Sequence, residues 1–343
     1  MIFPPAHRPL FILGLAILLA ALTLWSVATG AASIPLREVL DFFCGKSIPH
    51  ETVLWQLRLP RVLMALLIGG TLSVSGVLIQ GLFRNPLADP GLVGVSSGAA
   101  LGAVTVIILA GTFSYKFAWL HDARLLPWAA FLGGFLVCIL IQRLSSIGGQ
   151  TSVATLLLAG VAINALVGAV IGLATYLATD TQLRTLTFWT LGSLGGASWS
   201  TFFILLPFSS SVLLLAPFAA RLLNALALGE GEAGHLGFRV EMGKRLLILL
   251  VVVGVGVCVA LTGIIGFLGL VVPHVLRLLI GPDHRWLIPG SILFGAALLA
   301  VADTVSRIIV APSELPIGIV TAAFGAPVFL ALLWQQRRKL RFL

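Results

Sequence analysis

Long apolar runs, separated by short polar connectors, fill most of this sequence and limit the folds open to it. A bilayer core is about 30 Å thick and needs about 20 apolar residues for each spanning helix. Several runs reach that length, among them Leu59–Leu82 and Ser152–Thr179. The runs do not alternate between apolar and polar residues, as the strands of a membrane barrel would. Because lipid leaves backbone groups no other partner, the sequence predicts an all-α, polytopic membrane protein.

Composition supports the same class. The chain is 59% hydrophobic and only 10% charged, whereas a soluble domain has about 25% charged residues. The net charge of +9 could indicate nucleic-acid binding, but the basic residues lie at the ends of the apolar runs, where membrane topology places them. We therefore expect lipid contact and no nucleic-acid partner. The three cysteines are far apart and the six histidines are scattered singly, which predicts neither disulfides nor a metal site.

We predict one transmembrane domain that covers residues 1–343. The first apolar run is long enough to span, so we interpret it as a retained helix and not as a signal peptide. The split at Thr262–Gly263 divides an apolar run that is nearly continuous. Ten spans are expected, at Leu10–Thr29, Leu59–Leu82, Gly91–Ala110, Leu126–Leu144, Ser152–Thr179, Thr201–Leu222, Arg245–Leu261, Ile264–Ile280, Trp286–Ile308 and Pro316–Trp334.

Basic residues predict the orientation of these spans, because cytoplasmic connectors are rich in Lys and Arg. The tail Arg337-Arg338-Lys339 places the end of the last span inside, and an even number of spans then places the N-terminus inside too. Most of the 21 Lys and Arg residues fall on the inner side in this arrangement. We therefore expect both termini to be cytoplasmic.

Glycines at four-residue spacing predict smooth helix faces for close packing in the membrane. Gly94, Gly98 and Gly102 form one such series, and Gly168 and Gly172 form a second.

The sequence also restricts the energy source of any transport. No ionisable residue lies near the centre of a span, although a proton-coupled carrier needs one. The chain has no phosphate loop of the G-x-x-x-x-G-K-[ST] type, so energy is expected from a separate partner. Two alternatives remain open here: a secondary, ion-coupled transporter of a hydrophobic small molecule, and an intramembrane enzyme. The enzyme would require a buried catalytic pair, and none is visible, so we expect no enzymatic activity.

The longest inner connector, Asn224–Lys244, should form two short helices, because its glycines interrupt it. Its apolar residues suit either the groove of a soluble partner or the membrane surface, and residue chemistry alone leaves both possibilities open.

Several segments, in one order, resemble the ABC importer permeases that carry ferric siderophores, haem and cobalamin into bacteria. The resemblance runs from about Arg58 to Trp334. The matching segments are Leu57–Arg61, Gln80, Arg84–Pro90, Gly94–Ala99, Leu228-Gly229, Leu236-Gly237, Gly266–His274 and Glu314–Gly318.

This resemblance implies a homodimer of ten-helix, type II importer subunits in the bacterial inner membrane. Each dimer would bind two cytoplasmic ABC ATPases, which use ATP and Mg, and a periplasmic substrate-binding protein. The chain itself would carry no covalently bound cofactor. The segment Gln182–Trp189 and the residues around Asn85 are most similar to the haem branch, so haem is the expected cargo among the iron chelates.

The resemblance also implies roles for particular residues. Asn85 and Leu87, in a connector stiffened by Pro86 and Pro90, match an inner gate, and Thr151 and Ser152 match a second gate more loosely. The cytoplasmic coupling loop, at about 223–244, would insert into the ATPase. Its implied contact residues are Leu228, Gly229, Ala233, Leu236 and Gly237.

Three arginines are exceptions to the positive-inside bias and need a reason. Arg58 and Arg61 lie three residues apart at the outer mouth of the second span, so a helix that starts there places both on one face. Arg307 lies four residues after Asp303, with which it could pair. The arginines could also extend to lipid headgroups. The resemblance implies that exposed guanidinium groups bind carboxylates of the binding protein, for which their planar fork is suited.

Overall fold

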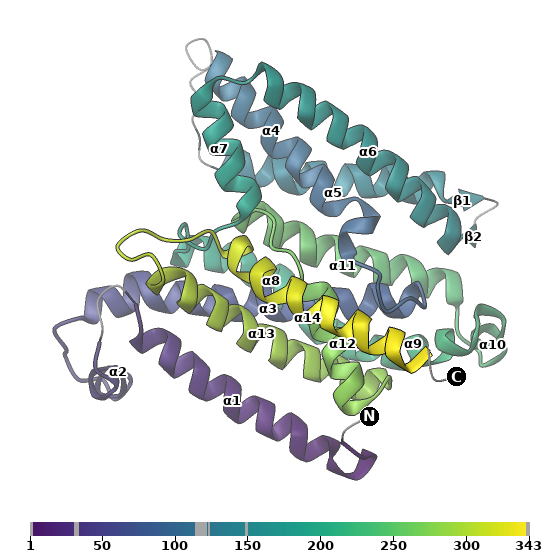
Figure 1. The fold of residues 1–343 in the computed structure, drawn as a ribbon, viewed down its shortest axis with the longest axis horizontal. Coiled ribbons are helices and arrows are strands. Elements are labelled where there is room, and N and C mark those ends of the chain that lie inside the picture. Colours follow the sequence, from purple (N-terminus) through teal and green to yellow (C-terminus); the bar gives the residue numbers. More distant parts are fainter. Residues whose placement is uncertain (1–2, 31–33, 114–121, 123, 148–149, 341–343) are drawn as a thin grey trace.

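The computed structural model describes residues 3–30, 34–113, 122, 124–147 and 150–340. The described chain is almost entirely helical, and its two short strands pair as one antiparallel hairpin (Figure 1). The elements in chain order are η1 Pro5–His7, α1 Arg8–Ala28, α2 Leu36–Phe43, the π-helical turn η2 Val53–Arg58, α3 Leu59–Leu82, η3 Pro90–Val93, α4 Val95–Phe113, α5 Leu125–Leu144, β1 Ser146–Ile147, β2 Gln150–Thr151, α6 Val153–Leu177, α7 Asp180–Leu191, α8 Trp199–Leu215, η5 Ala216–Ala219, α9 Ala220–Leu228, α10 Glu230–His235, α11 Val240–Thr262, α12 Leu268–Ile280, α13 His284–Ile308 and α14 Ile317–Leu340.

The predicted spans are confirmed within a few residues. Seven helical segments of the described chain are long and apolar enough to cross a membrane, and three shorter apolar helices, in α4, α12 and α14, complete the set. The split at Thr262–Gly263 is also confirmed. Gly263 has φ +75°, a conformation that glycine adopts without steric cost, and α11 ends directly before it.

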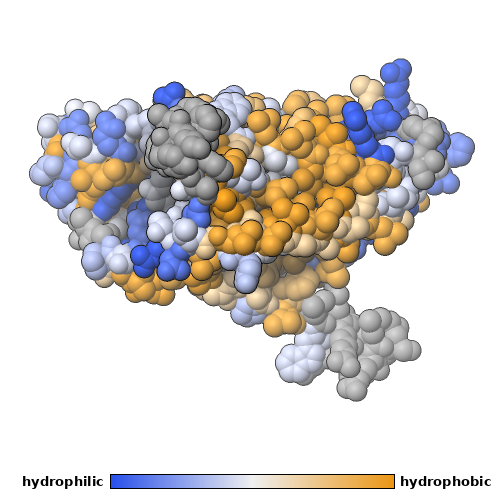
Figure 2. Space-filling view, turned by 90° about the horizontal axis from the view of Figure 1, so that it is seen from above, coloured by the Kyte–Doolittle hydropathy of each residue, from blue (hydrophilic) through white to orange (hydrophobic). Residues whose placement is uncertain are grey.

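Both ends of the described chain lie at one end of the bundle, together with α10 and the β1–β2 hairpin (Figure 1). We call this the inner end, and the opposite end, near α2 and the C-terminus of α13, the outer end. Figure 2 shows an apolar surface across the middle of the molecule, with hydrophilic residues gathered toward both ends. This distribution fits a bilayer that is crossed along the helix axes.

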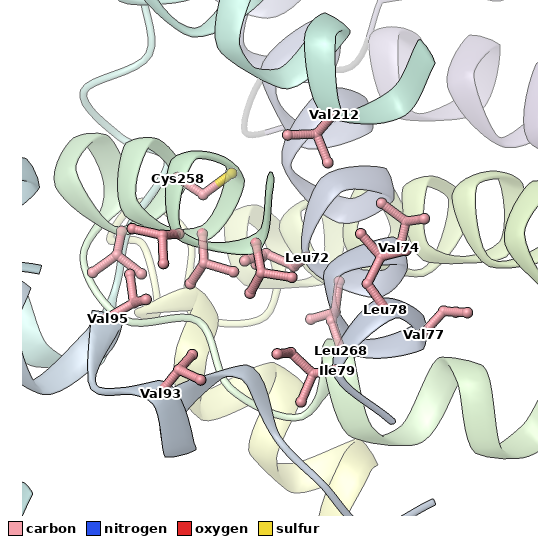
Figure 3. Close-up of a cluster of buried hydrophobic side chains, with 14 of the residues drawn as sticks. Leu72, Val74, Val77, Leu78, Ile79, Val93, Val95, Val212, Cys258 and Leu268 are labelled. Carbon is pink, nitrogen blue, oxygen red and sulfur yellow. The ribbon is translucent and has the colours of Figure 1, made fainter. Parts of the chain in front are cut away.

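Helix α3 forms the centre of the bundle, and almost all of its residues are buried. Its side chains Leu72, Val74 and Leu78 share one buried cluster with Val212 of α8 and Leu268 of α12 (Figure 3). Lipid tails are as apolar as these side chains, so association of the helices depends on close van der Waals contact.

Glycines permit that contact at several helix crossings. A Cβ atom on Gly76 would overlap the backbone of Gly269 in α12, and one on Gly98 of α4 would overlap the backbone of Gly133 in α5. The packing face predicted for Gly98 is therefore confirmed. The face predicted for Gly168 and Gly172 is not used by the described part of the subunit, in which no atom lies within 4 Å of a Cβ built at either position.

We expect Gly76→Ala to destabilise the subunit by about 1–3 kcal/mol, because the added methyl group forces α3 away from α12. Thermal unfolding of the detergent-solubilised protein measures this effect. Gly14→Ala, at an open position on α1, is the control and should unfold near the wild-type temperature. A wild-type unfolding temperature for Gly76→Ala would contradict the close crossing of α3 and α12.

Candidate functional site

A cavity of about 350 Å³, lined by four charged side chains among apolar ones, opens at the outer end of the bundle. Its lining includes all three arginines that the sequence analysis selected, together with Glu314 from the segment that precedes α14. The structure therefore brings together Arg58, Arg61 and Arg307, although Arg307 is far from the other two in the sequence.

Two of these arginines complete the end of α1. The last carbonyl groups of a helix have no partner within the helix and carry partial negative charge. Arg58 Nη1 donates to the carbonyls of Val27 at 2.8 Å and Ala28 at 2.6 Å. Arg307 donates to the carbonyls of Thr29 at 2.9 Å and Ser26 at 3.0 Å. The C-terminus of α1 is thus fixed to the end of η2, directly before α3, and to α13 by guanidinium groups.

Asp303 joins the remaining charges. Its carboxylate is fully buried and lies 2.9 Å from Arg61 Nη2 and 3.1 Å from Arg307 Nε. Arg61 Nη1 also contacts Glu314 Oε1 at 2.7 Å, and the Glu314 side chain is 43% exposed. A buried carboxylate between two guanidinium groups offsets much of the cost of removing each charge from water.

The three arginines are less accessible to a binding protein than the sequence predicted. All three are buried, and their side chains already bind groups of their own chain. The suggested pairing of Arg307 with Asp303 is confirmed, and the expectation of exposed guanidinium groups is wrong. The reason is tertiary: the end of α1 and the carboxylate of Asp303 occupy the donors. Binding of a partner at these arginines stays a prediction.

The predicted inner gate lies in the connector after α3. Asn85 and Leu87 are exposed, and Asn85 Oδ1 accepts a hydrogen bond of 2.9 Å from the Leu87 N–H. Asp89 Oδ1 accepts a 2.7 Å bond from the Gly91 N–H and caps the short helix η3. These bonds shape a compact turn with side chains on its surface, as expected for a gate, and the gating role itself stays a prediction.

The two residues of the second predicted gate, Thr151 and Ser152, differ in exposure. Ser152 is exposed and caps α6, where its Oγ accepts a bond from the Thr155 N–H at 3.3 Å. Thr151 is 3% exposed. Thr151 is therefore covered by neighbouring elements whereas Ser152 is not, and the gating role of both residues stays a prediction.

The inner connector forms two short helices, α9 and α10, as predicted. Gly229 separates them with φ +138°, and Gly237 ends the second with φ +88°. Leu228 and Leu236 are exposed, whereas Ala233 is completely buried. The loop therefore presents two apolar side chains at the inner end and uses Ala233 for its own packing.

Helix α9 is anchored to the start of α13. Asn224 Nδ2 donates to Asp283 Oδ1 at 2.7 Å, and Asn224 Oδ1 accepts from the His284 N–H at 3.0 Å. Partial burial opposes ionisation of Asp283, but hydrogen bonds from Asn224 and the Arg285 N–H outweigh it and hold the pKa of this carboxyl below its usual range.

Sequence analysis missed Lys244, which it treated as the last residue of an exposed connector. The Lys244 side chain is 2% exposed and binds Glu230, Glu241 and the Thr151 carbonyl. The spacing of Glu241 and Lys244, three residues apart at a helix start, was the one available signal. The other two partners lie far from Lys244 along the chain, and no local pattern indicates them.

A comparison with protein families matches residues 18–335 of this chain to the FecCD transport family. The hemin transport system permease protein HmuU of Yersinia pestis is 45% identical over 334 residues, which are 97% of this chain and 98% of that protein. The vitamin B12 import system permease protein BtuC of Shigella boydii is 40% identical over 332 residues, 96% of each chain.

Among solved structures, a metal-chelate type ABC transporter in an inward-facing conformation has a similar fold, with a TM-score of 0.81 and 32% sequence identity. The match covers 95% of this chain and 99% of that one.

Asp303→Asn should destabilise the subunit by about 3–5 kcal/mol, because it leaves two buried guanidinium groups without their shared countercharge. Glu314→Gln removes the same charge from a half-exposed partner of Arg61 and should cost about 0–1 kcal/mol. Thermal unfolding of both variants, side by side, measures the difference. Equal unfolding temperatures would show that Asp303 does not balance the cluster.

Proposed function

The chain belongs to the FecCD transport family, and on that premise we propose that it is the membrane-spanning permease of an ATP-driven importer whose cargo is haem. The observation that carries the choice of haem is the similarity to the hemin permease over almost the full length of both chains. The substantial similarity to a vitamin B12 permease makes cobalamin the main competing cargo.

Energy for transport comes from a separate ATP-binding-cassette subunit, as in the family. We propose that each permease subunit binds one such ATPase through α9 and α10, and that ATP and Mg²⁺ act there. The exposed Leu228 and Leu236 support this, because two separated apolar side chains on a short, well-anchored helical loop suit a groove in a soluble protein. In this arrangement the inner end, with both termini, faces the cytoplasm.

The outer cavity supports docking of a periplasmic binding protein. Three guanidinium groups and two carboxylates line or adjoin it, so one positive charge remains in excess. Glu314 is the accessible member of this set, and a carboxylate from a binding protein could replace it at Arg61 Nη1, which Glu314 contacts through Oε1. The docking role therefore requires an exchange of partners and not a free arginine.

We further propose that α6 forms part of the contact between two copies of the chain. Gly168 and Gly172 leave a smooth strip on α6 that no described residue of the subunit covers. Leu166 and Leu173 beside them are each 61% exposed. Small residues at four-residue spacing allow two membrane helices to approach closely, so this strip suits the same strip of a second subunit.

The cargo is tested with vesicles that contain the permease, its ATPase and internal ATP, and that receive loaded binding protein from outside. We expect uptake of haem and little uptake of cobalamin or a ferric siderophore. Uptake of cobalamin without haem would reject haem and retain the importer function. Uptake that continues without ATP would favour the secondary transporter instead.

The subunit contact is tested by disulfide cross-linking in membranes. Gly168→Cys should yield a cross-linked dimer on mild oxidation, because the two α6 strips face each other. Leu18→Cys, at an exposed position on α1, is the matched control and should remain monomeric on a denaturing gel. Cross-linking at residue 18 and none at residue 168 would place the contact on another helix.

A further inference from the structure

The ammonium group of Lys244 is enclosed at the start of α11 and uses all of its hydrogen-bonding capacity. It lies 2.7 Å from the Thr151 carbonyl, 2.9 Å from Glu230 Oε2 and 2.5 Å from Glu241 Oε1. An ammonium has three N–H donors, which these three acceptors match. A buried lysine charge would be unstable without such partners, so the position of each partner is fixed relative to the others.

The three partners belong to three different elements. Glu230 is the first residue of α10, Glu241 lies in the first turn of α11, and Thr151 ends strand β2. The Thr151 N–H also donates to Glu241 Oε2 at 2.9 Å. Both backbone groups of Thr151 are therefore held by side chains of α11, directly before α6 begins.

Hydrogen bonds to neighbouring elements help to position α6, because few of its own side chains are buried. Leu156, Gly160 and Val167 are its buried residues, and the rest of the helix is half-buried or exposed. Apart from Thr151, its polar contacts include the Ser152 N–H, which donates to the Ser145 carbonyl at 3.2 Å, and Asn164, which accepts from Ser97 Oγ at 2.5 Å and donates to the Gly91 carbonyl at 3.3 Å. A displacement of Thr151 would therefore act on the first turn of α6, ahead of Leu156, the first buried residue of the helix.

The bonds to the two half-exposed carboxylates, Glu230 and Glu241, are the exchangeable ones, and the bond to Glu230 is the one that joins α10 to α11. The Glu230 side chain is 39% exposed, so water can replace Lys244 as its partner, whereas the Thr151 carbonyl accepts its bond inside the structure. Helix α10 is thus attached to the start of α6 through one accessible ion pair and one buried ammonium.

We propose that Lys244 is a positioning residue that transmits movement of α10 to the inner end of α6 and to the exposed Ser152. The inference rests on the proposed function, in which the ATPase displaces the α9–α10 loop. The ion pair between Glu230 and Lys244 couples movement of α10 to α11. The two hydrogen bonds between Thr151 and side chains of α11 then couple that movement to the start of α6.

The test measures haem transported per ATP hydrolysed by the reconstituted complex of permease, ATPase and binding protein. Glu230→Ala removes the accessible bond, and Glu232→Ala removes the same charge from an exposed position two residues further along α10. We expect Glu230→Ala to lower the ratio by up to about fivefold, the range for one partly exposed ion pair. The ratio is taken per assembled complex, so that any change in ATPase binding through α10 is removed from it. The unfolding temperature should stay at the wild-type value, and Glu232→Ala, on the same helix, should keep the wild-type ratio.

A second variant distinguishes a loss of coupling between α10 and α6 from a loss of stability. Lys244→Met should lower the same ratio, and the double variant with Glu230→Ala should lose no more than Lys244→Met alone, because both substitutions break one pathway. Equal ratios for Glu230→Ala and Glu232→Ala would overturn the inference, as would a loss of transport that only parallels a loss of thermal stability. A wild-type complex that shows no ATP-dependent uptake would instead reject the proposed function.

Discussion

Direct contact between helix backbones is the interaction on which this structure depends. In lipid, apolar side chains gain little by leaving the solvent, so helices associate through close packing. Glycines on α3, α4 and their neighbours permit that packing, and α3 is consequently surrounded on nearly all sides. The rigid centre fixes where the ends of the other helices lie, and both polar regions form at those ends.

In both polar regions, buried charged side chains bind charged or polar groups from other elements. At the outer end, Arg58 and Arg307 satisfy the last carbonyls of α1, and Asp303 balances the guanidinium groups. At the inner end, Lys244 balances two carboxylates and holds Thr151. Each region joins helices that are distant in the sequence, and each retains half-exposed carboxylates: Glu314 at the outer end, and Glu230 and Glu241 at the inner end. A partner protein can therefore act on a buried network through an exposed member.

Helix α6 differs from the central helices. Its glycines at 168 and 172 leave a strip that the described part of the subunit does not cover, and polar bonds to Thr151 hold the segment directly before its inner end. An element with few buried contacts opens or shifts at a lower free energy than the core. The contrast between a fully buried α3 and a more exposed α6 fits the gating role that we predict near the start of α6.

The sequence by itself determined the membrane class, the positions of the ten spans, the break at Gly263 and the two short helices of the inner loop. Hydropathy and glycine are local signals, and in lipid each helix must satisfy its own backbone, so local signals are sufficient there. Only the tertiary structure decided that the three outer arginines are buried, that Thr151 is covered, and that Gly168 and Gly172 face no described helix of their own subunit. It also placed Lys244 between α10 and α6. These facts depend on contacts between residues up to 281 positions apart, as for Arg307 and Ser26, and spacing along one helix does not encode them.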